Sequence, residues 1–361
     1  MANFTATVVK IEVIPHPNAD AIELACVGDY FSIIKKDYLK TGDLAVYIQE
    51  GSIVPEYIQE EVGCIGKLAG KLKNRVKAAT LRGVLSQGLC YKARQDWIEG
   101  QDVAEIIGVT KYEVPIPPQF AGEVSNIDNI NTFNFDIENI KRYPHVIKEG
   151  ELVSITEKLH GTFTVVASLY DKEPIEHIYK GRAFATSKGL FSKGLVMRNI
   201  ERNKNNTYLK VANKFNLYEI ANTLSDRYKT NVYITGETFG DIQDLSYGLK
   251  KGEFDFRVFS IFKGDKSKSV PITAINDDEL EDILNEFSLK RVPVLYKGPF
   301  SKDIMLQYTD GLETYSGLET HIREGVIIEP LEQRYSPEVG RVVFKSVSAF
   351  YLNRKNGTEF N

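Results

Sequence analysis

The sequence predicts an α+β protein of two domains, a small β-barrel or sandwich followed by a larger domain of mainly antiparallel strands. At 361 residues, the chain is longer than a single compact unit usually is. Short β-branched and aromatic runs recur between Gly, Pro and Asn turns, as in antiparallel sheets. The sequence contains neither a βαβ repeat nor a GxxxxGK[ST] phosphate loop. A parallel nucleotide-binding sheet is therefore not expected.

Residues 1–110 are predicted to form the barrel. The strand-length runs are TATVVKIEVI, FSIIKK, DLAVYI and GLCYKA, and PHPNAD supplies a turn after the first of them. The basic segment KLAGKLKNRVKAATLRG is expected to be a loop or an irregular helix between strands. Residues 111–136 are rich in Pro and Asn and have no hydrophobic period, so we expect a linker there.

Residues 137–361 are predicted to form the second domain. ELVSITEKLHGTFTVVASLY has the pattern of two strands interrupted at Gly161, and further strands are NVYITGETFG, FDFRVFSIF, EGVIIEP and RVVFKSV. DDELEDILNEF has apolar residues at helical spacing and an acidic first turn, which is typical of a surface helix. The domain is therefore α+β with antiparallel strands predominating.

Composition limits the class of protein. The chain has 42% hydrophobic and 26% charged residues, as soluble globular proteins do, and no apolar run long enough for a membrane span. The N-terminus does not resemble a signal peptide. Cys26, Cys64 and Cys90 match neither a disulfide framework nor a zinc site, which favours a reducing, cytoplasmic location. We expect a monomer that does not bind membranes.

Basic residues are concentrated in three stretches, although the net charge is -4. Residues 64–94 hold eight bases and no acid, residues 180–214 hold nine bases and one acid, and residues 341–355 hold four bases and no acid. One such stretch is usually just a solvated surface. Three of them in an acidic chain favour a polyanionic partner, because locally positive surface attracts it and releases its counterions.

A lysine at the end of a predicted strand is the first candidate for chemistry. In EKLHGT, strand alternation puts Lys158, His160 and Thr162 on one face and Glu157 on the other. A lysine attacks phosphorus only when it is unprotonated, so it must be desolvated or lie near positive charge. By itself, the hexapeptide is equally compatible with a surface lysine beside a turn.

The motifs that follow resemble, in order, those of covalent nucleotidyltransferases. EKLHGT is similar to the first motif of RNA ligases of the phage nick-sealing type, YITGETFGDIQDLSYG to their third motif, and REGVIIEP to their fourth. The aromatic strand FDFRVF lies between the last two of these, and the series ends at Lys345, so five motifs lie in the right order over residues 157–345. In the first domain, PHPNAD and TGDLAVYIQEGSIVP resemble the OB domain of the ligases that seal nicks with an RNA 3′-OH strand. The resemblance implies an OB-type β-barrel followed by a nucleotidyltransferase domain.

The resemblance also implies roles for individual residues. Lys158 would attack ATP, expel pyrophosphate and carry AMP as a phosphoramidate. Glu157 would read the adenine amino group, and Phe259 would stack on the adenine. Glu237 would hold the ribose hydroxyls, because a carboxylate can accept two hydrogen bonds from a diol. His160, which stands where many nucleotidyltransferases have Asp, would act in the steps after lysine adenylylation.

The remaining implied roles concern metal and phosphate. Glu324 would bind Mg²⁺ or Mn²⁺ through water. Arg182 and Lys188 resemble the motif that positions the adenylylated 5′-phosphate, and Lys141 and Arg142 stand where the family orients the leaving pyrophosphate. Each of these four bases is equally compatible with ordinary surface charge.

The fifth motif departs from the family pattern. The family usually has two lysines separated by one residue, whereas Val343-Phe344-Lys345 has only the second. Lys345 is expected to contact the α-phosphate, and Arg341 is the natural replacement for the missing lysine.

The sequence therefore predicts an ATP-dependent RNA ligase that joins 3′-OH and 5′-phosphate ends through lysyl-AMP, with RNA or a nicked RNA-containing duplex as its partner. A DNA ligase or a GTP-using capping enzyme is the nearest alternative, although capping enzymes usually place their OB domain after the catalytic one. A non-catalytic RNA-binding protein is the other alternative. Lys158, Glu237, Glu324 and Lys345 are all present, which argues against a decayed enzyme.

Overall fold

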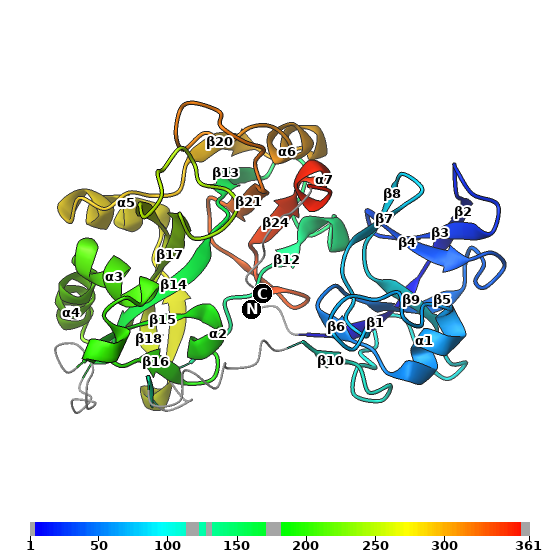
Figure 1. Ribbon diagram of the computed structural model, residues 1–361, viewed down its shortest axis with the longest axis horizontal. Coiled ribbons are helices and arrows are strands. Elements are labelled where there is room, and N and C mark those ends of the chain that lie inside the picture. Colours follow the sequence, from blue (N-terminus) through cyan, green and yellow to red (C-terminus); the bar gives the residue numbers. More distant parts are fainter. Residues whose placement is uncertain (1–3, 113–122, 128–131, 171–181, 355–361) are drawn as a thin grey trace.

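The computed structural model describes residues 4–112, 123–127, 132–170 and 182–354, and these form two lobes that lie side by side (Figure 1). The N-terminal lobe lies next to strand β12 (Glu138–Asn139) of the second lobe. Within the described ranges, no helix is both long and apolar enough to cross a membrane.

The N-terminal lobe is a small antiparallel barrel. Its elements are β1 (Ala6–Lys10), β2 (Glu12–Pro15), β3 (Ile22–Val27), β4 (Tyr30–Lys35), β5 (Leu44–Ile48), β6 (Ser52–Ile53), α1 (Glu56–Val62), β7 (Ala79–Leu81), β8 (Val84–Ser86), β9 (Leu89–Lys92) and β10 (Thr110–Lys111). One sheet has the order β1-β5-β9 and another β2-β3-β4, and β6-β10 and β7-β8 form two further pairs. Ala6 and Val8 of β1 alternate into a fully buried core with Val46 and Ile48 of β5, which is the strand period of two.

The predicted strands of this lobe are confirmed, but several elements were not predicted. The four apolar runs correspond to β1 with β2, and to β4, β5 and β9, and PHPNAD includes the turn that follows β2. The basic segment 67–83 consists of turns that lead into the hairpin β7-β8, so it contains no helix. β3 and α1 had no clear sequence signal.

The second lobe is built on two five-stranded sheets. Its strands are β11 (Val124–Asn126), β12, β13 (Leu152–Lys158), β14 (Thr162–Ser168), β15 (Ala183–Ser187), β16 (Leu195–Met197), β17 (Val232–Gly240), β18 (Phe254–Asp265), β19 (Val270–Ala274), β20 (Val294–Pro299), β21 (Gly325–Pro330), β22 (Tyr335–Ser336), β23 (Gly340–Arg341) and β24 (Phe344–Val347). The first sheet has the order β12-β24-β21-β13-β20 and the second β15-β14-β17-β18-β19. Neighbouring strands are antiparallel, except for the parallel pair β12-β24.

Helices and 3-10 turns connect or follow these strands. They are α2 (Lys188–Phe191), α3 (Thr207–Lys214), α4 (Leu217–Tyr228), α5 (Asp277–Glu286), α6 (Lys302–Thr309), α7 (Ala349–Leu352), and the 3-10 turns η3 (Ile140–Arg142), η4 (Glu201–Asn203) and η5 (Lys266–Lys268). α3, α4 and α5 share a buried core with the second sheet, and α6 packs on the first (Figure 1). α5 is the predicted surface helix, and it buries Leu280, Ile283 and Leu284.

The predicted linker, residues 111–136, lies partly outside the described residues. Its described ends belong to the two lobes. Lys111 pairs with Ser52 of the barrel, and β11 pairs with β16 in the second lobe. Phe133 packs edge-on against Tyr233 beneath the second sheet.

Candidate active site

Lys158 is the last residue of β13, where the chain leaves the first sheet for the second. It pairs with Gly325 of β21, and its ammonium group contacts Glu324 Oε1. A Cβ at Gly325 would lie 2.1 Å from the carbonyl oxygen of Ser346, so no larger residue fits beside Lys158 without a backbone shift. The alternation predicted through EKLHGT holds only as far as Lys158, because Thr162 already pairs with Thr238 in the second sheet.

Three lysines and two carboxylates converge near this strand end. Burial lowers the pKa of Lys345 on β24, and the charges of Lys158 and Lys188 lower it further. Burial raises the pKa of Glu237 on β17 to about 8, Glu324 adds to this effect, and Lys158 and Lys188 oppose it. The predicted nucleophile therefore lies in a partly desolvated place that is rich in positive charge.

A divalent cation would find one carboxylate of the right kind in this cluster. Among the residues that the structure describes, no three His, Cys, Asp or Glu side chains are grouped closely enough to hold a metal by themselves. The oxygen donors of Glu324 suit a hard cation, which would take its other ligands from water and substrate phosphates.

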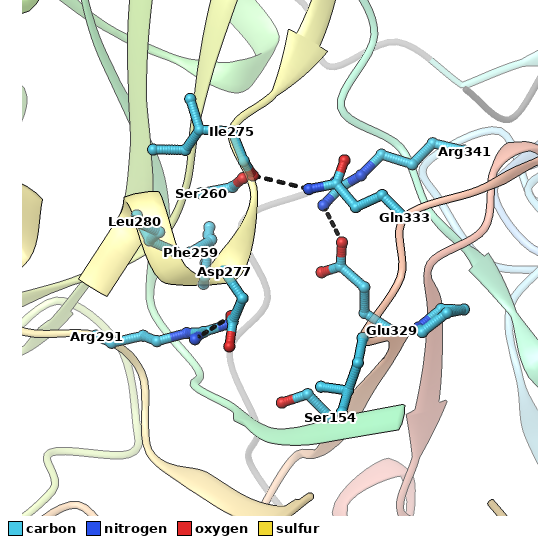
Figure 2. Close-up of a pocket in the computed structure, with 12 residues that line it drawn as sticks. Ser154, Phe259, Ser260, Ile275, Asp277, Leu280, Arg291, Glu329, Gln333 and Arg341 are labelled. Carbon is cyan, nitrogen blue, oxygen red and sulfur yellow. Dashed lines mark hydrogen bonds and ion pairs between the residues drawn. The ribbon is translucent and has the colours of Figure 1, made fainter. Parts of the chain in front are cut away.

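Phe259 lies in the second sheet opposite the first-sheet strands. The register of β17 against β18 shifts at this point, since Ser260 pairs with Thr235 and Val258 with Gly236. Phe259 is therefore the extra residue of a β-bulge, a device that redirects a side chain. Its ring lies 5.3 Å from that of Phe163, and it lines a pocket with residues of the first sheet (Figure 2).

The same pocket contains Arg341, the predicted replacement for the missing lysine. The Arg341 guanidinium is paired with Glu329 (Figure 2). It also lies 5.5 Å from the ring of Phe262. The largest charge effects on the pKa of Lys345 come from Lys158 and Lys188, which lower it, and from Glu50 and Glu138, which raise it. The Arg341 guanidinium is held by Glu329, and its role as the replacement for the missing lysine stays a prediction.

Glu157 is buried on the other face of β13, as strand alternation predicts. Its Oε2 accepts a hydrogen bond from the backbone N–H of Thr314 at 2.9 Å. Its Oε1 has no hydrogen-bond partner among the described residues, and burial raises the pKa of the carboxyl. An orphaned buried acceptor is costly unless a ligand supplies the donor.

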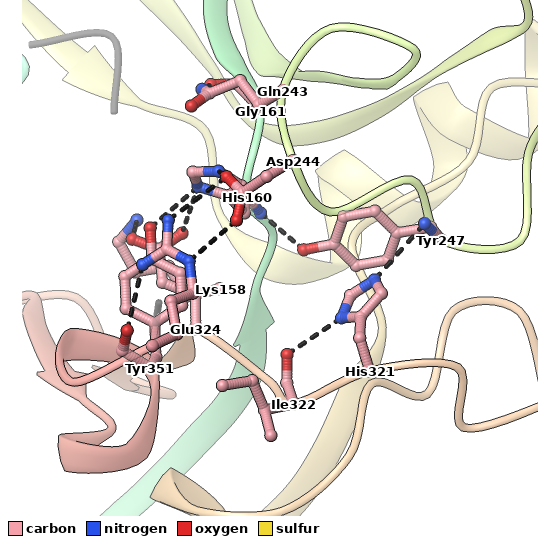
Figure 3. Close-up of polar contacts among 11 residues, drawn as sticks. Lys158, His160, Gly161, Gln243, Asp244, Tyr247, His321, Ile322, Glu324 and Tyr351 are labelled. Carbon is pink, nitrogen blue, oxygen red and sulfur yellow. Dashed lines mark hydrogen bonds and ion pairs between the residues drawn. The ribbon is translucent and has the colours of Figure 1, made fainter. Parts of the chain in front are cut away.

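His160 lies in the crossover between the sheets, and both of its ring nitrogens have partners (Figure 3). Nε2 is 2.9 Å from Asp244 Oδ1, and Nδ1 is 2.8 Å from the hydroxyl of Tyr351. Nδ1 is also 3.8 Å from Glu324 Oε2. Burial lowers the pKa of His160, although the charges of Glu324 and Asp244 oppose this. The ring therefore has a defined orientation beside the carboxylate that contacts Lys158.

Residues of the third motif hydrogen-bond to the crossover (Figure 3). Gln243 donates to the carbonyl oxygen of Gly161, and the Tyr247 hydroxyl accepts from the backbone N–H of His160 at 2.6 Å. Tyr247 is almost fully buried and adopts a left-handed backbone with φ 55°, which is rare for an aromatic residue. Such a conformation persists only where the surroundings enforce it.

Lys188 reaches the cluster, whereas Arg182 does not. Lys188 follows β15 and pairs with Asp136 at 2.7 Å. Burial tends to raise the pKa of Asp136, but the charges of Lys188 and Lys111 outweigh it and hold the pKa below its ordinary value. Arg182 precedes the opposite end of β15 and forms a two-pronged pair with Asp226 of α4. The strand register thus removes Arg182 from the predicted phosphate site.

Arg142, predicted to orient pyrophosphate, instead joins the two lobes. Its guanidinium donates to Gln49 Oε1 at 2.6 Å and to the hydroxyls of Thr5 and Thr7 at 2.8 and 3.0 Å. Lys141 is also close to the interface, since its carbonyl oxygen accepts from the backbone N–H of Asp29.

The charges around the Lys141 side chain belong to this interface too. Burial lowers the pKa of Lys141, and charged groups of the second lobe (Asp310 and Lys302) and of the barrel (Asp29 and Glu50) also act on it. The Arg142 side chain is engaged with the barrel, and a role of either residue in orienting pyrophosphate stays a prediction.

Three site residues were missed by sequence reasoning. Asp244 lies inside a quoted motif, but its partner could not be read from spacing. Tyr351 and Asp136 lie far from His160 and Lys188 in the sequence, at separations of 191 and 52 residues. Only the folded arrangement brings these pairs together.

Comparison with known proteins agrees with this geometry. The RNA ligase family model matches residues 151–347, and an OB-fold domain model matches residues 5–93. A point mutant of the Naegleria gruberi RNA ligase with AMP and Mn is 24% identical, with a TM-score of 0.74 over 97% of this chain and 98% of that chain. The same ligase with PPi gives identical values. Another mutant with ATP and Mn is 25% identical, with a TM-score of 0.73 over the same shares.

No curated protein sequence matches the chain significantly. The structural matches confirm the predicted fold, an OB barrel followed by an antiparallel-sheet ligase domain. The RNA ligase family model spans more than half of the chain and contains Lys158, Glu237, Glu324 and Lys345. This chain belongs to the RNA ligase family.

Proposed function

We propose that this protein is an ATP-dependent RNA ligase that seals nicks whose 3′-OH strand is RNA, and that it carries AMP on Lys158. The observation that carries the proposal is the convergence of Lys158, Lys188 and Lys345 beside Glu237 and Glu324 at the end of β13. Such a cluster suits a nucleophilic amine and a polyphosphate in the same cleft.

The proposed reaction has three phosphoryl transfers. First, the unprotonated Lys158 amine attacks the α-phosphorus of ATP, pyrophosphate leaves, and the amine loses a proton to solvent. Second, a 5′-phosphate oxygen attacks the same phosphorus, the N–P bond breaks, and the lysine nitrogen takes up a proton from solvent as the amine is regenerated. Third, a 3′-OH attacks the adenylylated 5′-phosphate, AMP leaves, a phosphodiester forms, and the hydroxyl proton passes to solvent. Positioning and charge neutralisation supply most of the catalysis in such steps.

In this proposal, residues around Lys158 bind the adenine, the ribose and the α-phosphate of ATP. The free Oε1 of Glu157 can accept a hydrogen bond from the adenine amino group, and Phe259 can stack on the base. Glu237 would hold the ribose hydroxyls. Lys188 and Lys345 would neutralise the α-phosphate, the role that other members of the family give to two lysines of the fifth motif.

A divalent cation, Mg²⁺ or Mn²⁺, would neutralise phosphate charge when it is bound beside Glu324. Support comes from the Naegleria ligase, whose structures contain ATP or AMP together with Mn. The described residues contain no group of three His, Cys, Asp or Glu side chains that could hold a metal alone, which fits a cation that arrives with the nucleotide.

We propose that residues 1–110 form the nucleic-acid-binding domain, that residues 111–136 form the linker, and that residues 137–361 form the catalytic domain. The stretch 64–94, with eight bases and no acid, would contact phosphates of a nicked duplex. All three cysteines are free thiols, which suits a cytoplasmic location. We propose that the enzyme acts as a monomer.

Covalent labelling tests the chemistry. The protein is incubated with each α-labelled NTP and a divalent cation, denatured, and examined for bound label. We expect labelling by ATP alone. Preferential labelling by GTP would indicate a capping-type enzyme, and absence of any label would indicate a non-catalytic RNA-binding protein.

A sealing time course tests the substrate. The nicks differ only in the sugars of the last two 3′ nucleotides. We expect faster sealing of the ribonucleotide end, because only this end offers a 2′-OH to the site. Equal rates would favour a DNA ligase.

A further inference from the structure

We propose that Tyr351 and Asp244 are positioning residues that hold the His160 imidazole in one tautomer and one orientation for the steps after lysine adenylylation. The proposal rests on the proposed function, in which His160 acts in those steps. It adds two residues that no sequence motif assigns to the reaction, one of them on α7, after the last motif lysine.

The two contacts of the imidazole determine where its proton lies. A carboxylate only accepts hydrogen bonds, so the 2.9 Å contact of Asp244 Oδ1 requires a hydrogen on Nε2. In the neutral ring, Nδ1 is then an acceptor, and it receives the Tyr351 hydroxyl at 2.8 Å (Figure 3). His160 and Tyr351 are only 4% and 2% exposed, so water does not compete effectively for these bonds.

Both partners of the ring are themselves held in place. The second oxygen of Asp244 is paired with Arg354 Nε at 2.9 Å. The Arg354 guanidinium lies 3.7 Å from the centre of the Tyr351 ring and donates to the Tyr351 carbonyl oxygen at 3.0 Å. Asp244, Arg354 and Tyr351 thus form one connected unit that closes α7 onto the crossover.

The imidazole lies close to the reacting groups. His160 is two residues from Lys158, and its Nδ1 is 3.8 Å from Glu324 Oε2, whose other oxygen contacts Lys158. The charged groups that face the ring are Glu324, Asp244 and Arg354. At this distance, a small rotation of the imidazole changes its alignment with a phosphate that Lys158 carries, and small misplacements are costly in such sites.

The residues around Tyr351 indicate that the polar contacts of its hydroxyl and of His160 do more than fill space. Tyr351 belongs to a buried apolar cluster with Leu159 and Phe239, which a phenylalanine would fill equally well. Burying a hydroxyl, an imidazole and a carboxylate there removes water from these polar groups. The protein tolerates this cost only if each group has a hydrogen-bond partner. The arrangement meets that requirement at both ring nitrogens.

The test uses Tyr351→Phe, which keeps the ring, and Asp244→Ala, with Asp244→Asn as the conservative variant that can still accept from Nε2–H. Tyr296→Phe is the matched control, since it removes one hydroxyl bond, to Pro299 O, from edge strand β20. Sealing is measured on a nick that already carries an adenylylated 5′-phosphate, alongside lysine labelling by ATP.

We expect kcat for the adenylylated nick to fall roughly tenfold in Tyr351→Phe and in Asp244→Ala, the effect of one lost buried hydrogen bond. KM and lysine labelling should stay near wild-type values, and Asp244→Asn should recover part of the loss. Normal labelling also shows that each variant is folded. Tyr296→Phe should match wild type in every measurement.

The His160→Ala variant separates the proposed role of His160 from the positioning role of Tyr351 and Asp244. If His160→Ala fails to seal while Tyr351→Phe and Asp244→Ala seal normally, the positioning role is overturned and the proposed role of His160 stands. If His160→Ala itself seals normally, the role of His160 is overturned and the positioning role with it. If Tyr351→Phe lost labelling and sealing to the same extent, Tyr351 would have only a structural role.

Discussion

Two buried acids of the candidate site reduce the stability of the free protein. Glu237 lies near Lys158 and Lys188, and its pKa of about 8 means that the folded protein disfavours its ionised form. Glu157 has a buried carboxyl oxygen without a partner among the described residues. In the proposed function, both groups accept hydrogen bonds from the nucleoside of ATP.

Glu237→Gln should therefore stabilise the protein at alkaline pH. Below the ordinary pKa of 4.5, the carboxyl is protonated in folded and unfolded chains alike. Between about 4.5 and 8, only the unfolded chain loses the proton, so rising pH favours unfolding of the wild type. Above pH 8 both forms are ionised and the penalty is complete. We expect the Tm advantage of Glu237→Gln to grow from pH 5 to pH 8 and then level off.

The same variant should lose affinity for ATP, because an amide is a weaker partner for two ribose hydroxyls than a carboxylate. Thermal unfolding measured at several pH values, with and without ATP, gives both results. A Tm difference that does not change with pH would contradict the raised pKa of Glu237.

Motif order was enough to group Lys158, Glu237, Glu324 and Lys345 as candidate site residues, and their roles stay predictions. In the structure, Lys158 contacts Glu324, and its charge acts on Glu237 and on Lys345. The contacts of Arg142 with the barrel could not be predicted, because motif spacing does not encode where the barrel lies.

The places of Arg182, Lys188 and Tyr351 in the fold could not be predicted for similar reasons. Arg182 and Lys188 flank one short strand, and only the pairing register of β15 with β14 decides which of them reaches the site. Tyr351 belongs to a helix that no motif covers.

Among the structural elements, the crossover from β13 to β14 determines the geometry of the site. Gly161 lies against the neighbouring strand, and a Cβ there would be 2.1 Å from the carbonyl oxygen of Thr238. The long strands β13, β14, β17 and β18 of the second lobe were predicted correctly, since each is a run of β-branched and aromatic residues long enough to be recognised. The short strands β7, β8, β22 and β23 were missed, because two or three residues carry too little pattern.

Gly161→Ala should displace the crossover and with it His160. We expect a loss of stability of about 1–3 kcal/mol, the usual effect of overpacking. Lysine labelling by ATP should fall strongly, because Leu159 and Lys158 move with the backbone. The checks are chemical denaturation and the labelling assay.

Gly189→Ala provides the control, since a Cβ at this α2 residue meets nothing within 4 Å. It should keep full labelling and gain stability by about 0.5–1 kcal/mol from helix propensity. If Gly161→Ala behaved like Gly189→Ala, the close packing of the crossover would not be required for activity.

For the whole molecule, the contact between the lobes is the feature that sequence could not predict. The buried Arg142 guanidinium binds three side chains of the barrel and lies 3.5 Å from Glu138. Lys302 and Asp29 add an ion pair at 2.7 Å. These contacts fix the barrel beside the first sheet, next to the strand that pairs with β24 and hence close to Lys345 (Figure 1).

Arg142→Ala should loosen the barrel without removing a group from the nucleotide site. Breaking a buried charged contact typically costs about 3 kcal/mol. We expect a larger radius of gyration by small-angle scattering and a loss of nick sealing that exceeds the loss of lysine labelling. Arg202→Ala removes an exposed side chain that pairs with Glu123 within the second lobe, and it should change neither property. Unchanged scattering and sealing in Arg142→Ala would show that the lobes are held by other contacts.

The central claim is that AMP passes through Lys158 to the nucleic acid, and a chase experiment tests it most directly. Wild-type protein is labelled with α-labelled ATP, freed of nucleotide, and mixed with a nicked duplex whose 3′ end is RNA. The account predicts that label leaves the protein, appears on the 5′-phosphate and ends as free AMP while the nick is sealed. It also predicts that Lys158→Ala takes no label yet still seals a nick that is already adenylylated. Label retained on the Ala variant, or label on the wild type that nicked nucleic acid does not discharge, would contradict it.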